Sequence, residues 1–312
     1  MEKILEKVKE KKVIALIGNS KNSGKTTTLN YMLDNFQNAG VLTIGLDGEE
    51  KDLLYGNFKP KIHLRKGQCV CASKDQLKYG FEILDQVDKD NLYIARALTD
   101  LDLSIVNPGG RTEIEKVISK LSEYVDIVFI DGAFDRIFSV SIVDGVIFCV
   151  GTSDKNLLRF KNIYSLLNLP VKKLKIPYNS IYRDSKYIPV DCDLMVIDCL
   201  RRSLTKYEAG DFLLLKGALT REMSSILKKV EVVVSDPSRV MLNYSELKKF
   251  FSNNNHLFVS KRPEILFLSL NTFNPDNFDK DPISFYHEVR KITDKHLVLN
   301  LMSGGEKCFS VL

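Results

Sequence analysis

The segment from Val13 to Thr27 constrains the fold of this chain more than any other part of its 312 residues. A short apolar run, residues 13–17, leads into a polar loop, and Gly24-Lys25-Thr26 then opens a stretch with amphipathic helical spacing. A strand, such a loop and a helix, in that order, form the setting of a P-loop, whose backbone N–H groups and helix N-terminus surround phosphate groups. The sequence therefore predicts an α/β core built around a phosphate-binding loop.

Each residue type in this loop has a chemical role. Lys25 is expected to reach the β- and γ-phosphates as a catalytic residue, and the Thr26 hydroxyl to coordinate Mg²⁺. Gly24 lets the backbone approach the phosphate oxygens because it has no Cβ. Lys21 is a further lysine of the loop, to which we assign no catalytic role. The expected nucleotide contacts are Asn19, Ser20, Lys21, Asn22, Ser23, Gly24, Lys25, Thr26 and Thr27.

The loop departs from the strict pattern G-x-x-x-x-G-K-[ST] at its first position. That pattern would place a glycine at position 19, where this chain has Asn19, and the glycine comes one residue earlier, at Gly18. Asparagine tolerates a positive φ better than most residues. Two alternatives follow: Asn19 takes the left-handed turn, or the loop is one residue longer. A plain turn before a capped helix is the simpler explanation, but the order of the elements favours phosphate binding.

Acidic residues follow two of the predicted strands. The apolar run 127–130 ends at Asp131, which we expect to bind Mg²⁺ directly or through water. Asp47 and Glu49 follow the predicted strand 41–46 and would face the same edge, because parallel strands collect ligands at their carboxyl ends. Either acid is a candidate to orient the attacking water, and Asp47 a candidate to share the metal. A solvated acidic turn is an equally good explanation, so both alternatives stay open.

Apolar runs alternate with helical patterns over most of the chain, which favours a mostly parallel, helix-covered sheet of the P-loop NTPase type. We expect a nucleotide-binding core over residues 1–170, with a small antiparallel β insertion over 56–100. Residues 171–312 are expected to form an α/β extension, either separate from the core or continuous with it. The predicted strands of the main elements are 13–17, 41–46, 103–106, 127–130, 143–150, 194–199, 212–215, 230–234, 257–259, 265–270 and 297–301.

Local signals place two of the helices. Apolar residues at 29, 32, 33 and 36 have helical spacing, and Gly40 is expected to end that helix. Thr112 and Glu115 form an S/T-x-x-E pattern, which predicts a capping box at the start of the helix that follows.

Composition excludes several classes of function. The net charge of +5 is too small for a dedicated polybasic binder, so we expect no nucleic-acid partner. No stretch approaches the roughly 20 apolar residues of a membrane span, so we expect no membrane partner either. The six cysteines lack framework spacing, which favours a reducing, cytoplasmic location. No Asn-Lys-x-Asp motif follows a late strand, so ATP is the expected nucleotide, with GTP not excluded.

Several segments together resemble one family, the P-loop subunit of the reactivase encoded beside adenosylcobalamin- and PLP-dependent lysine and ornithine aminomutases. The resemblance covers most of the chain and is strongest around Asp47 and Asp131. The matching segments are Ser-Lys-Asn-Ser-Gly-Lys-Thr at 20–26, Thr-Ile-Gly-Leu-Asp-Gly-Glu at 43–49, Lys-Pro-Lys-Ile at 59–62, Ile-Asp-Gly-Ala-Phe-Asp-Arg at 130–136, Val-Asp-Gly-Val-Ile at 143–147, Lys-Gly-Ala-Leu-Thr at 216–220 and Asn-Thr-Phe-Asn-Pro at 271–275.

The resemblance implies an ATPase that acts as a molecular chaperone. Its partners would be a B12-dependent aminomutase and a second ATPase subunit similar to mismatch-repair MutS proteins. Two other functions fit the loop. One is a kinase or ligase with its small-molecule site in residues 160–312, and the other is a nucleotide switch that serves a cofactor-maturation enzyme.

Overall fold

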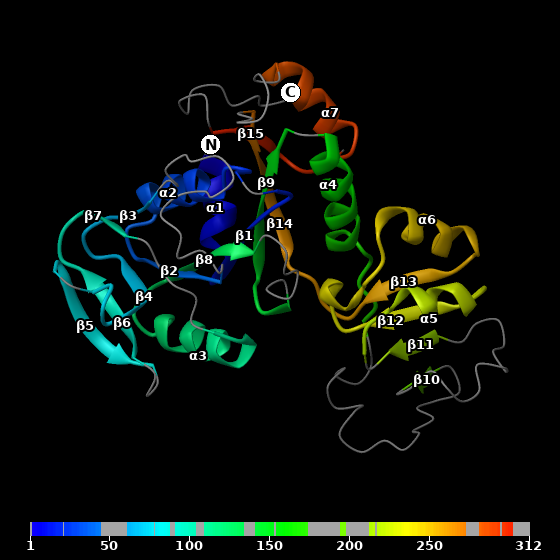
Figure 1. Ribbon diagram of the computed structural model, residues 1–312, viewed down its shortest axis with the longest axis horizontal. Helices are drawn as coiled ribbons and strands as arrows, with labels where there is room; N and C mark the ends of the chain where they lie inside the picture. The colour runs from blue at the N-terminus through cyan, green and yellow to red at the C-terminus, as the bar shows by residue number, and fades with distance from the viewer. Residues whose placement is uncertain are drawn as a thin grey trace. The chain divides into compact units, whose positions relative to one another are not determined.

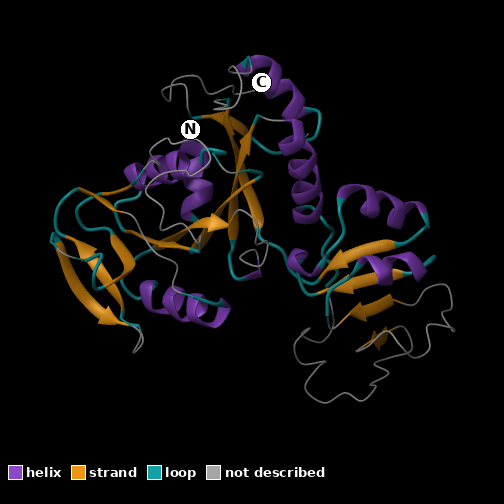
Figure 2. Cartoon of the chain, in the orientation of Figure 1, coloured by secondary structure: helices purple, strands orange, loops and turns teal. Residues whose placement is uncertain are grey.

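A sheet of nine strands organises the first of two α/β units in a computed structural model of the chain (Figure 1). The strand order is β15-β14-β9-β1-β8-β2-β4-β6-β5. All pairs from β15 to β4 are parallel, and the last two pairs are antiparallel. Helices are interspersed among the strands, although β2 to β7 follow one another with no helix between them in the described residues (Figure 2). The expected α/β class with a mostly parallel sheet is confirmed.

The structure describes residues 2–20, 22–44, 61–77, 79–87, 91–103, 109–133, 141–152, 154–173, 194–197, 212–215, 217–272, 281–293 and 295–301. In chain order the elements are α1 (Glu2–Lys9), β1 (Val13–Gly18), α2 (Lys25–Asn35), β2 (Ala39–Thr43), β3 (Ile62–Leu64), β4 (Cys69–Ser73), β5 (Phe81–Gln86), β6 (Leu92–Ala97), β7 (Leu101–Leu103), α3 (Arg111–Leu121), β8 (Ile127–Ala133), β9 (Gly145–Gly151), α4 (Asp154–Leu167), β10 (Leu194–Ile197), β11 (Phe212–Leu215), α5 (Arg221–Ile226), β12 (Glu231–Val234), the 3₁₀ helix η2 (Pro237–Arg239), α6 (Tyr244–Ser252), β13 (His256–Val259), β14 (Glu264–Asn271), α7 (Pro282–Arg290) and β15 (Val298–Asn300).

The centre of the large sheet is apolar on both faces. Every residue of β1 and of β9 is buried, as continuous apolar runs in helix-covered parallel strands require. Ala39 and Val41 of β2 pack into the same core as α1 and α2, whereas a Cβ on Gly40 would point at Leu121 of α3. Since side chains alternate along a strand, α3 covers the opposite face from α1 and α2 (Figure 1).

Gly40 therefore does not end a helix, and that expectation is wrong. Helix α2 ends at Asn35, and Gly40 lies inside β2, where it pairs with Val128 of β8. A Cβ at position 40 would lie 2.8 Å from the Leu121 Cγ, so the close approach of α3 is what requires glycine there.

The capping box expected at Thr112 and Glu115 is also wrong. Helix α3 begins at Arg111, and Gly110 occupies its N-cap position without a side-chain cap. Glu115 instead accepts a hydrogen bond of 2.8 Å from the Arg111 guanidinium one turn earlier. The exposed ion pair holds Glu115 along the helix surface.

Antiparallel strands occupy the region expected to hold the β insertion. Strands β4, β6 and β5 pair antiparallel to one another, and β4 joins them to the edge of the large sheet through a parallel pairing with β2. Strands β3 and β7 form a separate antiparallel pair. This region thus extends the main sheet.

The second unit has its own sheet and core. Strands β10, β11, β12 and β13 lie in that order and all are parallel. Its main run is Leu158–Pro263, after which the chain returns to the first unit at Glu264. The boundary expected at residue 170 falls near the start of this run, whereas β14 and β15 belong to the large sheet. Among the described residues, every helix is too short or too polar to cross a lipid bilayer.

Candidate phosphate-binding site

The loop between β1 and α2 lies where the strand order of the large sheet reverses. β8 and β2, which follow in the chain, lie on one side of β1, and β9 and β14 lie on the other. In open parallel sheets, ligands bind beyond the carboxyl ends of the strands at such a reversal. The fold therefore places the described loop residues, 19–20 and 22–24, at the position where a ligand is expected.

Among the described residues of the loop, two adopt left-handed backbone conformations. They are Asn22, with φ of 56°, and Gly24, with φ of 85°, and not Asn19. The glycine that the loop needs near its start is Gly18, because a Cβ there would lie 2.2 Å from the Ser23 Oγ. Of the two alternatives for the start of the loop, the left-handed turn at Asn19 is wrong, and the loop begins one residue earlier.

Asn19 attaches the loop to β9. Its side-chain oxygen accepts a hydrogen bond of 2.8 Å from the Gly151 N–H, and its Nδ2 donates to the Gly151 carbonyl at 3.2 Å. Its backbone N–H donates to the Cys149 carbonyl at 3.3 Å. We expected Asn19 to contact the nucleotide, but both its side chain and its N–H are engaged within the protein.

Strand β14, which is the neighbour of β9 in the sheet, also holds the loop. The Asn271 Nδ2 donates to the Asn22 carbonyl at 2.5 Å, and the Ser269 and Thr28 hydroxyls are 2.8 Å apart. From the sequence alone, Asn271 is named only as part of a segment that resembles the reactivase family, and Ser269 is not identified as a residue of the site. The signal that marks both residues is a polar side chain at alternate positions near the end of an apolar strand.

Lys25 and the first turn of α2 close the loop. The Lys25 Nζ donates to the Ser20 carbonyl at 3.4 Å and lies 3.2 Å from where a Cβ on Gly18 would stand. Thr26 and Thr27 are half-buried in the first turn of the helix. The N-cap residue, Gly24, provides no side-chain cap, so the helix presents N–H groups and the positive end of its dipole at the loop.

Ser23 has a buried hydroxyl without a hydrogen-bond partner in the described part of the chain. Only 1% of the residue is exposed, and its Oγ lies against Gly18, as does the Lys25 Nζ. The Thr152 Oγ1, just beyond β9, is also buried without such a partner among the described residues. Buried hydroxyls are nearly always hydrogen-bonded, so the Ser23 hydroxyl makes the inside of the loop a candidate position for a ligand oxygen.

Asp131 lies in β8, the strand next to β1, and is the register partner of Thr43. Its charge and that of Lys25 both act on the Cys149 thiol. Burial raises the pKa of Cys149, and the Asp131 carboxylate adds to this rise. A hydrogen bond between the Cys149 sulfur and the Thr28 hydroxyl and the charge of Lys25 oppose it, and the resulting pKa is about 12. Asp131 and Lys25 therefore lie at the same end of the sheet.

Three predicted site residues, Lys21, Asp47 and Glu49, lie outside the described residues, so their roles stay predictions. Within the described ranges, no three histidine, cysteine or acidic side chains gather as a metal site would require. Mg²⁺ bound with a nucleotide needs only one or two carboxylates beside phosphate and water oxygens, so Asp131 and Thr26 remain a suitable pair.

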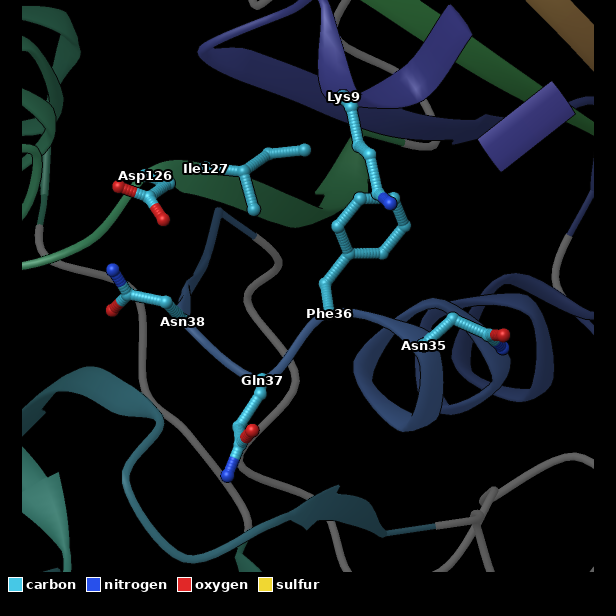
Figure 3. A pocket seen from close by; sticks show the side chains of 7 residues that line it. All are labelled: Lys9, Asn35, Phe36, Gln37, Asn38, Asp126 and Ile127. Atoms are coloured by element: carbon cyan, nitrogen blue, oxygen red, sulfur yellow. The ribbon is translucent and has the colours of Figure 1, made fainter. Parts of the chain in front are cut away.

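A hollow of about 420 Å³ lies elsewhere in the first unit (Figure 3). It is lined at the end of α2 by Asn35 and Phe36, and at the start of β8 by Asp126 and Ile127. Those positions are at the opposite ends of α2 and β8 from Lys25 and Asp131. The hollow is therefore separate from the loop.

No family model, curated protein or solved structure matched this chain when it was compared with them.

Proposed function

We propose that this chain is a P-loop nucleoside triphosphatase that binds ATP with Mg²⁺ at the loop from Gly18 to Thr26. The observation that carries this proposal is the Ser23 hydroxyl, which is buried without a partner among the described residues and lies against Gly18 beside the Lys25 ammonium. A phosphate oxygen in the loop would accept hydrogen bonds from Ser23 and from the N–H groups at the start of α2.

The charges at the carboxyl ends of the strands suit a triphosphate. Lys25 would hold the β- and γ-phosphates, and Thr26 and Asp131 supply the hard oxygen ligands that Mg²⁺ prefers. The metal, when bound, neutralises charge on the phosphate oxygens. Asp47 and Glu49 remain the proposed residues for orienting the attacking water.

We propose that this ATPase acts as the reactivating subunit for an adenosylcobalamin-dependent amino-acid aminomutase. The support for this role is the resemblance of the segments around Ser20, Asp47 and Asp131. Such enzymes hold a damaged cofactor in a closed site, and opening it requires a population shift of several kcal/mol. Binding and hydrolysis of ATP by a partner could drive that shift.

Replacement of Lys25 tests the nucleotide site. Titration calorimetry with Mg–ATP is expected to show micromolar binding by the native chain and at least a 100-fold weaker affinity for Lys25→Ala. Lys116→Ala, which removes an exposed lysine of α3, is the matched control and should bind like the native chain. Micromolar ATP binding by Lys25→Ala would contradict the proposed site.

A separate experiment tests the chaperone role. The tagged chain is used to capture proteins from native extract with and without ATP and Mg²⁺, and an aminomutase is expected to be retained in a nucleotide-dependent manner. Turnover should be slow and stimulated by that protein. Turnover that depends on a small acceptor, with no protein stimulation, would indicate a kinase or ligase instead.

A further inference from the structure

We propose that Asn271, at the end of β14, is a positioning residue that sets the direction of a loop N–H group toward the phosphates. This inference rests on the proposed nucleotide site. The geometry that carries it is the 2.5 Å hydrogen bond from the Asn271 Nδ2 to the carbonyl of Asn22, a residue held at a φ of 56°.

Peptide geometry turns this contact into a constraint on Ser23. The carbonyl of Asn22 and the N–H of Ser23 belong to one planar trans peptide, so they point in opposite directions. When Asn271 holds the carbonyl on its own side, the Ser23 N–H must point away from β14. Without that contact the peptide can rotate and present its carbonyl oxygen where an anion should bind.

Packing around Asn271 leaves it little freedom. The residue is 4% exposed, and a Cβ on Gly24 would lie 3.1 Å from the Asn271 Cβ. Two residues earlier on the same face of the strand, Ser269 contacts the Thr28 hydroxyl in the first turn of α2. The end of β14 therefore supports the loop and the helix from one side, so the amide of Asn271 acts from a fixed position.

The proposal predicts that replacing Asn271 affects only the binding of the phosphate groups of a ligand. A misdirected N–H in the loop lowers the affinity for every polyphosphate by the same factor, whether or not a nucleoside is attached. A residue that contacted the base would instead affect ATP and leave inorganic tripolyphosphate unchanged. The two ligands therefore separate positioning of the loop from recognition of the nucleoside.

The test compares Asn271→Ala and Asn271→Asp with the native chain in titrations with Mg–ATP and Mg–tripolyphosphate. Asn271→Ala should bind both ligands at least 10-fold more weakly at every pH. Asn271→Asp should show a loss at least as large at pH 8, because its carboxylate repels the Asn22 carbonyl oxygen and the phosphates. It should recover toward native affinity at pH 5.5, because burial raises the pKa of a carboxyl group at this position and the protonated form can donate to the Asn22 carbonyl. A purely structural defect would not recover in this way.

Asn35→Asp is the matched control. Asn35 also donates from its side-chain amide to a backbone carbonyl, that of Tyr31 at 2.8 Å, but it lies at the end of α2 that is far from the loop. The substitution removes this donor and adds the same negative charge as Asn271→Asp. The control should bind both ligands like the native chain, and circular dichroism checks that every variant is folded.

Each outcome decides between the two proposals. If the native chain binds neither ligand, the proposed nucleotide site is overturned and this inference with it. If the native chain binds both ligands and folded Asn271 variants bind them within twofold of it, only the inference is overturned. A loss confined to ATP would overturn it as well, because that pattern indicates a contact with the base.

Discussion

Ser23 in the loop and Ser269 beside it on β14 are both buried, but they differ in the hydrogen bonding of their hydroxyl groups. The Ser269 hydroxyl lies 2.8 Å from that of Thr28, whereas the Ser23 hydroxyl has no hydrogen-bond partner within the described residues. A buried hydroxyl without a partner costs about 1–3 kcal/mol, and a satisfied one contributes about 1 kcal/mol. Ser23 is thus expected to lower the stability of the ligand-free protein. The proposed phosphate ligand would provide the missing hydrogen-bond partner of its hydroxyl.

We predict that Ser23→Ala leaves the free energy of unfolding of the free protein unchanged or raises it by about 1 kcal/mol, because the variant no longer buries an unsatisfied hydroxyl. The same variant should weaken binding of Mg–ATP by about 10-fold. Denaturant unfolding and calorimetry measure the two effects. Ser269→Ala is the control and should lose about 1 kcal/mol of stability, since its hydroxyl is already paired. A destabilised Ser23→Ala with native affinity would contradict this role of the hydroxyl.

The contact between α3 and β2 is set by the absence of a side chain at Gly40. We predict that Gly40→Ala destabilises the protein by about 1–3 kcal/mol, because its Cβ would overlap Leu121. Thermal or denaturant unfolding measures the loss.

A double-mutant cycle checks the cause of that loss. Leu121→Ala alone should cost about 2–5 kcal/mol through the cavity that it leaves. In Gly40→Ala/Leu121→Ala the overlap with the Leu121 side chain is removed, whereas the contact of 3.0 Å with the Val125 Cγ2 remains. The two single losses should therefore sum to more than the loss of the double variant. Strict additivity would show that α3 does not set the requirement for glycine.

Ion pairs join the start of β14 to helix α1 and to the turn that follows this helix. Lys7 and Lys11 each lie 2.7 Å from a carboxylate oxygen of Glu264. Burial alone would raise the pKa of Glu264, but hydrogen bonds from Lys11 and Lys7 outweigh burial, and the pKa lies below its ordinary value. A carboxyl group whose pKa is lowered by folding adds stability above its unfolded pKa of about 4.3.

We therefore predict that Glu264→Gln is about 0.5–1 kcal/mol less stable than the native chain at pH 7, a modest value because the pair is partly exposed. The difference should shrink as the pH falls below about 4.3 and vanish below the folded pKa. Urea unfolding at several pH values measures it. Glu6→Gln, at an exposed position of α1, should show no such pH-dependent difference. A constant deficit at all pH values would exclude the ion pair as its source.

Local sequence patterns predicted the elements but not their contacts. Apolar runs located β1 and β9 because strands buried on both faces need continuous apolar residues. Gly40 was misassigned because a glycine that ends a helix and one that admits a neighbouring helix look the same in sequence. Asn271 was missed as part of the site because its partner, Asn22, lies 249 positions away. Pairings of that kind depend on how the sheet is ordered, which local patterns do not reveal.

The two units of the molecule differ in how their sheets are assembled from the chain. Phe129 of β8 and Phe267 of β14 belong to the same apolar core of the first unit, although they come from distant parts of the sequence. Phe250 of α6 belongs to the core of the second unit. The first sheet thus includes strands from before and after the second unit.

We predict that Phe267→Ala and Phe129→Ala weaken the same unfolding unit, by about 3–5 kcal/mol each. Hydrogen exchange should show faster exchange at both 127–133 and 264–271 in either variant, with β12 and β13 unaffected. Phe250→Ala is the matched control and should have the reverse effect. Equal loss of protection in both units after any one substitution would show that they unfold together.

The long return of the chain to its first sheet has a consequence for biosynthesis. The amide of Asn271 emerges from the ribosome 249 residues after the carbonyl that it holds. At about 5–20 residues per second, roughly 12–50 s separate the two. In the later part of that interval, after β9 has been made, the nascent polypeptide has β1 and β9 but not β14, so one edge of its central apolar strands lacks a neighbour. The nascent chain is thus vulnerable to aggregation until β14 has been made, and the proposed ATP site can form only after that strand is in place.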